Sequence, residues 1–182
     1  MDNPTTLLVA IMYVTIVATG LVNVLLALSD IVGGKSKSDA LHTGWLVLLL
    51  LAYLSFFWET TAILDIEGWN FFAFLSFIIG PIALLFASNL VTSPKEVDEA
   101  PIGSYYFEQG RRFFLLLCLV QFWVIGLDVV FDSINYATYT TGGIAAVFLV
   151  LMVSKSHRLH VAGLVILLLA FFVRIIFRAA FG

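Results

Sequence analysis

Residues 41–64, LHTGWLVLLLLAYLSFFWETTAIL, decide the fold class. This stretch is long enough to cross roughly 30 Å of hydrocarbon as an α-helix, and Glu59 is its only charged residue. A helix is the expected structure because it pairs its own backbone groups, which lipid cannot do. Five further apolar stretches flank it, at residues 6–28, 69–91, 113–132, 134–153 and 160–181. The sequence therefore predicts an all-α, six-helix transmembrane bundle that occupies residues 1–182 as a single domain.

The composition agrees with a protein whose main partner is the lipid bilayer. Hydrophobic residues make up 62% of the chain and charged residues 12%, whereas soluble domains carry about a quarter charged residues. The net charge of −3 and the lack of a basic stripe give no reason to expect a nucleic-acid partner. Cys118 is the only cysteine, so no intramolecular disulfide can form, and it is expected to be a small buried hydrophobe. The first residues lack the basic region of a signal peptide, so we expect the first helix to be retained.

The distribution of positive charge predicts the orientation. The first, third and fifth loops carry all seven loop Lys and Arg residues, and the second carries Asp65 and Glu67. Positive loops stay in the cytoplasm, so both termini are expected outside. Trp69, Tyr136 and Tyr139 fit an outer aromatic belt. The seven basic residues are Lys35, Lys37, Lys95, Arg111, Arg112, Lys155 and Arg158.

Prolines mark two further features. The third loop, residues 92–109, reads TSPKEVDEAPIGSYYFEQ and is acidic, which favours a solvated linker over a docking strip for a partner. Gly80-Pro81 lies inside the predicted helix 69–91, and Pro81 removes one backbone hydrogen bond there. A kink is therefore expected, either as a packing feature or as room for a ligand.

Residues 36–52 and 154–170 resemble each other. They read SKSDALHTGWLVLLLLA and SKSHRLHVAGLVILLLA, and eleven of the seventeen positions match. Both segments enter the membrane from the same side, so the pattern indicates a weak parallel repeat of three helical hairpins. Chance similarity between biased sequences is the alternative.

Charged residues inside the predicted spans form one layer in the outer half of the membrane. Glu59 lies 17 residues after His42, which corresponds to roughly 26 Å of helix. Asp128 and Asp132 share one face of a helix, and Arg174 and Arg178 share a face of another. The two helices run in the same direction, which predicts the pairs Asp128–Arg174 and Asp132–Arg178.

The charged layer has two interpretations. Paired charges that hold the bundle together, or arginines that reach the headgroups, would make it structural. A polar pocket or ion path that opens outward, with Glu59 as a proton-coupled carboxylate, would make it functional. A subunit contact is a third alternative. Asn23, deep in the first span, is expected to form a hydrogen bond with another helix.

Histidines cluster at the cytoplasmic boundary, where His42 and His160 occupy equivalent positions of the repeat and His157 lies one turn before His160. A heme or a metal ion is the less favoured interpretation, because no HxxxH, CxxCH or carboxylate ligand set accompanies these residues. Retinal bound as a Schiff base is excluded, because no lysine lies in a span. No motif names a reaction, so a non-enzymatic role is favoured and no catalytic residue is assigned.

Residues 20–114 carry a resemblance to known proteins. It rests on GLVNVLLALSDIV, LHTGW, FFW, GWNFFAFLSFIIGPIALLFAS and YYFEQGRRFF. In these segments the chain resembles a family of small, uncharacterised bacterial membrane proteins with several spans. The resemblance implies a bacterial inner membrane and no particular activity.

Three classes of function remain open. The favoured one is a small transport, channel or ligand-binding protein that uses the outer charged layer. The second is a non-catalytic membrane partner or sensor subunit, or a homo-oligomer, which an exposed small-residue face around Ala137, Thr141 and Ala145 would favour. The third is a heme- or metal-binding protein that uses the histidines.

Overall fold

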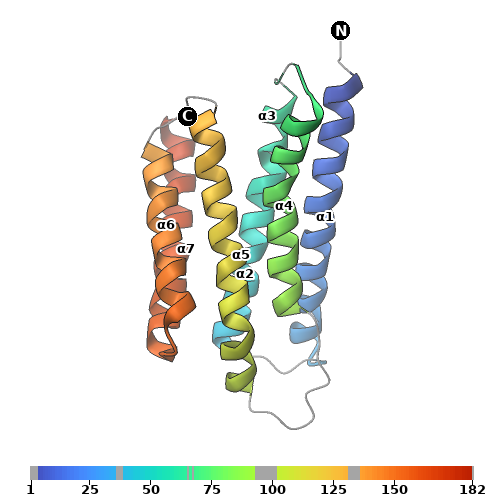
Figure 1. Cartoon of the computed structure of the whole chain (residues 1–182). Coiled ribbons are helices and arrows are strands. Elements are labelled where there is room, and N and C mark those ends of the chain that lie inside the picture. The colour runs from blue at the N-terminus through green and yellow to red at the C-terminus, as the bar shows by residue number, and fades with distance from the viewer. Residues whose placement is uncertain are drawn as a thin grey trace.

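The computed structural model describes the backbone of residues 4–35, 39–64, 66, 68–92, 102–130 and 136–181, and the side chains of these residues except 62, 102–109 and 174–181. Within these ranges the protein is all-helical (Figure 1). Its helices are α1 (Pro4–Val32), α2 (Ala40–Trp58), α3 (Thr60–Ile63), α4 (Phe71–Thr92), α5 (Ile102–Val130), α6 (Tyr136–Val153) and α7 (His157–Phe181).

Five of the helices are long and apolar enough to cross a membrane, judged by length and composition. They are α1, α2, α4, residues 110–130 of α5, and α6. The predicted sixth span corresponds to α7, a helix of 25 residues. The apolar part of α7 whose side chains are described, His157–Val173, is shorter than a full span.

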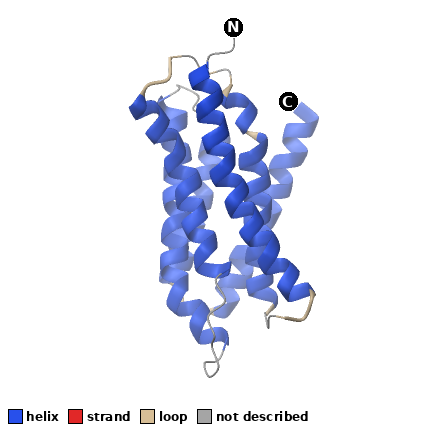
Figure 2. Cartoon of the chain, turned by 90° about the vertical axis from the view of Figure 1, so that its right-hand side faces the viewer, coloured by secondary structure: helices blue, strands red, loops and turns tan. Residues whose placement is uncertain are grey.

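The long helices run roughly parallel to one another and alternate in direction (Figures 1 and 2). Each of the sequence pairs α1–α2, α4–α5 and α6–α7 packs together, as three hairpins would. Contacts of α1 with α4, of α5 with α6 and of α7 with α2 join these pairs into a closed ring. We call the end at which α1 begins and α7 ends the upper end, and the opposite end the lower end (Figure 1).

Local signals explain where several helices begin and end. Asp39 caps α2 by accepting a hydrogen bond from the His42 N–H at 2.6 Å. Asn70 does the same for α4, accepting from the Ala73 N–H at 2.9 Å. After Val32 the chain leaves α1 through Gly34, whose φ of 71° lies in the left-handed region that favours glycine.

Two predicted boundaries differ from the structure. The predicted span 41–64 is broken, because α2 ends at Trp58 and α3 begins at Thr60. The hydroxyls of Thr60 and Thr61 bind the carbonyls of Phe56 and Trp58, and such bonds compete with a regular helix. The predicted linker 92–109 is also partly helical, because α5 begins at Ile102, directly after a proline in the sequence. Proline is common near the start of a helix, so the sequence at this point fits a helix that begins at Ile102.

Candidate functional site

The predicted charged layer is only partly within the described side chains. Glu59 is half-buried at the junction of α2 and α3, within electrostatic reach of the buried Tyr13 on α1. Asp128, near the upper end of α5, accepts a hydrogen bond from the Thr138 hydroxyl on α6 at 2.7 Å. This bond ties α5 to α6 at the upper end.

The two predicted charge pairs remain predictions. Asp132 lies outside the described residues, and the side chains of Arg174 and Arg178 on α7 also lie outside them. One contact between α5 and α7 lies at the lower end, where the Phe114 and His160 rings are 5.3 Å apart. The pairs Asp128–Arg174 and Asp132–Arg178 therefore await a direct test.

The histidines occupy the first turns of two neighbouring helices. His42 is in the first turn of α2, and His160 is in the first turn of α7. His160 is only 2% exposed, and its Nε2 lies 3.0 Å from the Ser154 carbonyl oxygen, which closes the turn between α6 and α7. His157 is exposed. Among the described residues, no group of three or more His, Cys, Asp or Glu side chains is arranged to hold a metal ion.

A polar cluster lies between α1, α2 and α4. The Asn23 side-chain N–H₂ on α1 donates to the Asn89 side-chain oxygen on α4 at 3.0 Å, which confirms the hydrogen bond expected for Asn23. Nearby, the Tyr53 hydroxyl on α2 and the Ser88 hydroxyl on α4 are 2.8 Å apart. The Tyr53 ring fits against Gly20 of α1, where any side chain would collide with it. These contacts pair buried polar groups across three helices, as hydrogen bonds in membrane bundles do.

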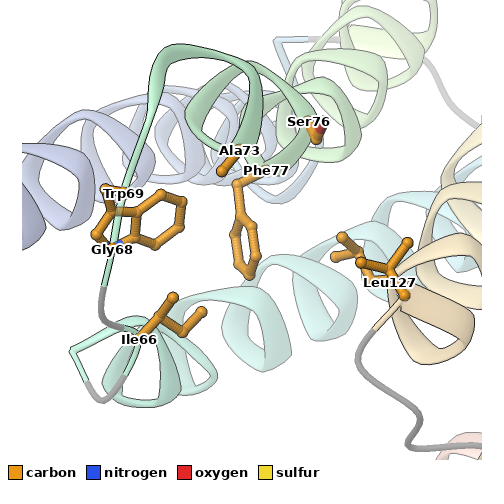
Figure 3. A pocket seen from close by; sticks show the side chains of 8 residues that line it. Ile66, Gly68, Trp69, Ala73, Ser76, Phe77 and Leu127 are labelled. Carbon is orange, nitrogen blue, oxygen red and sulfur yellow. The ribbon is translucent and has the colours of Figure 1, made fainter.

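A cleft of about 280 Å³ opens near the upper end of the bundle, between the α3–α4 connection, α4 and α5. In Figure 3, Trp69 and Leu127 lie at opposite ends of the cleft with the Phe77 ring between them. Ser76 contributes a hydroxyl, which already donates to the Phe72 carbonyl oxygen at 2.8 Å. The remaining described lining is apolar. The lining residues are Ile66, Gly68, Trp69, Ala73, Ser76, Phe77, Leu127 and Val130.

The cleft lies at the depth of the predicted charged layer but does not reach Glu59. Leu127 and Val130, which line it, lie on either side of Asp128 in the sequence of α5. Glu59 is not among the lining residues. Phe72, at the start of α4, is 77% exposed, and Val130 is 76% exposed. At Val130, therefore, the cleft lining includes a side chain that faces the surroundings of the bundle.

Trp123 of α5 fixes the position of α4 below the cleft. Its indole N–H donates to the Ser76 carbonyl oxygen at 2.5 Å, and its ring occupies the space that a side chain at Gly80 would need. The ring also contacts Phe77 of α4 edge-on and stacks on Phe56 of α2, with centroid distances of 6.4 Å and 6.0 Å. Gly80 thus admits a large ring beside Pro81, which lies inside α4 as the sequence predicts.

Trp69 carries a buried hydrogen-bond donor without an acceptor. Its Nε1 is covered by protein atoms and has no partner, while its ring lines the cleft and contacts Phe77 edge-on at 5.1 Å. Trp45 has the same deficit but lies in the core, packed against Phe114 and Phe148. A buried donor without an acceptor lowers the stability of the folded protein by about 1–3 kcal/mol, so both indole N–H groups need an explanation. Sequence reasoning assigned Trp69 only to an aromatic belt.

Around Thr141 and Ala145, α6 does not present the exposed small-residue face that would favour a partner protein. Thr141 and Ala145 are buried against α5, and Ala137 is half-buried. The Cys118 thiol on α5 lies 3.8 Å from the Ala145 carbonyl oxygen, which shows how closely the two helices approach. Cys118 itself is buried, as expected. Small residues on α6 therefore serve the contact with α5 within the bundle, because they let the two backbones come close.

No protein family model, no curated protein and no solved structure matches this chain. The assignment therefore rests on the fold, which is an all-helical bundle with five helices able to cross a membrane. These features define a multi-pass membrane protein in contact with a lipid bilayer.

Proposed function

We propose that the protein binds a small apolar molecule in the cleft between the α3–α4 connection, α4 and α5. The observation that carries the proposal is the cleft itself, with Trp69, Phe77 and Leu127 in its lining. Its volume of about 280 Å³ is close to the lower end of the range for small-molecule sites, and such sites are lined mainly by apolar and aromatic side chains. The binding of a ligand, with or without its transport, is the function class that this cleft favours.

The surroundings of the cleft indicate where the molecule comes from. The cleft lining includes the exposed side chain of Val130, and exposed side chains on a membrane-spanning helix face lipid. An apolar molecule dissolved in the bilayer can therefore reach the cleft without crossing water. No charged side chain is among its described lining residues, which disfavours an ion as the ligand.

Two observations weigh against the other function classes. Thr141 and Ala145, whose exposure on α6 would favour a partner surface, are instead buried. Among the described side chains, the histidines form no metal-ligand group, and His160 contributes to the turn between α6 and α7. The cleft is a structural feature that the ligand-binding class explains and the two alternatives do not.

The protein is further proposed to lie in a bacterial inner membrane with its lower end in the cytoplasm. Five basic residues of the lower end have described side chains, and all five are exposed: Lys35, Arg111, Arg112, Lys155 and Arg158. The cleft then opens toward the outer half of the bilayer. This orientation follows from the excess of Lys and Arg in cytoplasmic loops.

Photolabelling tests the proposed function. The protein in lipid nanodiscs is exposed to a diazirine-bearing alkane, and labelled residues are located by mass spectrometry. We expect labels to concentrate on residues 66–77 and 127–130 and to be competed by unlabelled decane. Even labelling of lipid-facing residues, such as Leu25 and Leu119, without competition would overturn the proposal.

A matched pair of variants sharpens this test. Ala73→Trp places a large ring in the cleft, whereas Ala146→Trp places the same ring on an exposed face of α6. The first should remove most of the labelling of α5 and the second should leave it unchanged. Leu127→Trp fills the cleft from the opposite wall, so that a folding defect at one position does not decide the result.

A further inference from the structure

We infer that the ligand of the cleft carries a carbonyl oxygen, which accepts a hydrogen bond from the Trp69 indole N–H. The inference rests on the proposed function, because it names the chemistry of the molecule that the cleft would hold. It starts from the Trp69 Nε1, a buried donor without an acceptor in a residue whose ring lines the cleft.

Two other polar side chains at or beside the cleft already have partners. The Ser76 hydroxyl donates to the Phe72 carbonyl oxygen, and the Trp123 indole donates to the Ser76 carbonyl oxygen. Trp69 is thus the donor in the described lining that a ligand can still satisfy. A buried indole N–H normally finds an acceptor, and a neutral oxygen suits a lining without described charges.

The position of Trp69 explains how a ligand reaches this donor. The nitrogen is covered by neighbouring atoms while the ring borders the cleft, so an oxygen meets it after the indole has turned within the cleft. Gly68 precedes Trp69 with a φ of 75°, and a side chain there would meet nothing within 4 Å. This φ lies in the left-handed region that favours glycine, so the chain turns directly before Trp69.

The depth of Trp69 selects carbonyl compounds of the bilayer. Trp69 lies just before α4 begins, at the upper boundary of a span, where tryptophans sit at the level of lipid headgroups. The acyl ester of a lipid places a carbonyl at this level with its hydrocarbon chain pointing inward. A free ketone or quinone offers the same oxygen on a separate molecule. Both sources share an apolar body that carries at least one carbonyl oxygen.

The indole N–H signals of ¹⁵N-tryptophan-labelled protein test the inference. The probes are 2-decanone and decane, added to protein in nanodiscs of ether-linked phosphatidylcholine. The Trp69 proton should move downfield with 2-decanone and not with decane, because only the ketone accepts a hydrogen bond. The Trp45 proton should not move with either probe, because its equally unpaired N–H lies in the core, away from the cleft. Trp69→Phe assigns the Trp69 signal.

The outcomes separate the sources and the two proposals. If ester-linked lipid alone moves the Trp69 proton downfield, the acyl ester is the source, and if only 2-decanone does so, the source is a free molecule. Trp69→Phe should lower the affinity for 2-decanone by between about twofold and tenfold more than it lowers that for decane, because both probes lose the same apolar contact and only the ketone loses a hydrogen bond. If both probes compete with the photolabel but neither moves the Trp69 proton, the carbonyl inference is wrong and the proposed function stands. If neither probe competes with the photolabel, the proposed function is wrong, and the carbonyl inference that rests on it is wrong too.

Discussion

At the scale of single residues, Gly20 sets how closely α1 approaches α2. The Tyr53 ring lies where a side chain at position 20 would be, and its hydroxyl reaches Ser88 on α4. One missing side chain therefore allows a tyrosine to connect three helices. The same reasoning applies at Gly80, where the Trp123 ring takes the place of a side chain.

We expect Gly20→Ala to destabilise the protein by about 1–3 kcal/mol, because an added methyl group overpacks the contact with Tyr53. Gly126→Ala on α5 is the matched control, since a side chain there meets nothing within 4 Å. Unfolding in mixed micelles with increasing dodecyl sulfate measures both free energies. Equal effects of the two substitutions would show that helix propensity, not the fit against Tyr53, controls stability.

The hydrogen bond between Asn23 and Asn89 is expected to contribute modestly. A double-mutant cycle with Asn23→Leu and Asn89→Leu should give a coupling energy of about 0.6 kcal/mol, the average for such bonds in a membrane protein. The same unfolding measurement gives this number. A coupling energy of zero would mean that this hydrogen bond adds nothing to stability, because each amide forms equally good hydrogen bonds elsewhere when the other is removed.

Residue-scale prediction from sequence succeeded where a polar side chain stood alone in an apolar run. Asn23 is such a case, and its partner on another helix is confirmed. Tyr53, Ser88 and Trp69 were not singled out for the contacts that they make. Tyrosine, serine and tryptophan are ordinary residues of membrane helices, so their contacts depend on which helices are neighbours, and spacing within one helix does not reveal this.

At the scale of elements, the packing of α4 on α5 depends on Gly80 and Trp123. Gly80→Ala should push Trp123 away, break its hydrogen bond to the Ser76 carbonyl oxygen and disturb the cleft above. We expect a destabilisation of about 1–3 kcal/mol and a loss of photolabelling at Leu127. Trp123→Leu combined with Gly80→Ala should recover part of the stability. No recovery in the double variant would contradict the fit that we describe.

The charge pairs between α5 and α7 form a separate prediction at this scale. If Asp128 pairs with Arg174 away from water, Arg174→Gln should cost about 3–5 kcal/mol, and Asp128→Asn should restore part of it by removing the orphaned charge. A pair at the wet boundary would cost about 0–1 kcal/mol. Additive losses in the double variant would mean that the two residues do not pair. Unfolding in mixed micelles measures all three variants.

The elements themselves were largely predictable. Apolar stretches located the six long helices, because length and hydropathy determine what can cross a bilayer. The break after Trp58 and the start of α5 at Ile102 were not predicted. Hydropathy does not register threonine hydroxyls that bind backbone carbonyls, nor a proline that begins a helix.

At the scale of the whole molecule, the ring of helices brings α2 and α7 side by side. These helices carry the repeated sequence, and at two of the matched leucine positions both leucines face the interior. Leu46 and Leu164 are buried, and so are Leu49 and Leu167. The repeat thus corresponds to two parallel helices that share these two buried positions, whereas Leu41 is buried and the matched Leu159 is exposed. The sequence did not predict that α2 and α7 pack side by side. The spacing of apolar residues indicates which face of a helix is buried, but not which helix packs against that face.

The orientation in the membrane is a prediction for the whole molecule. Tyr136→Cys at the upper end and Lys155→Cys at the lower end are both at exposed positions, while the native Cys118 is buried. In intact spheroplasts, a membrane-impermeant maleimide should label position 136 and not position 155 until the membrane is permeabilised. The reverse pattern would invert the orientation and place the cleft in the inner half of the bilayer.

The central claim is that the bundle holds one small apolar molecule in its cleft, and native mass spectrometry measures this most directly. Protein released from nanodiscs should retain a single added 2-decanone or decane molecule in a saturable manner. Ala73→Trp should abolish this retention and Ala146→Trp should preserve it, because only position 73 lines the cleft. Unsaturable uptake of several molecules, equal in the wild type and both variants, would contradict a specific site.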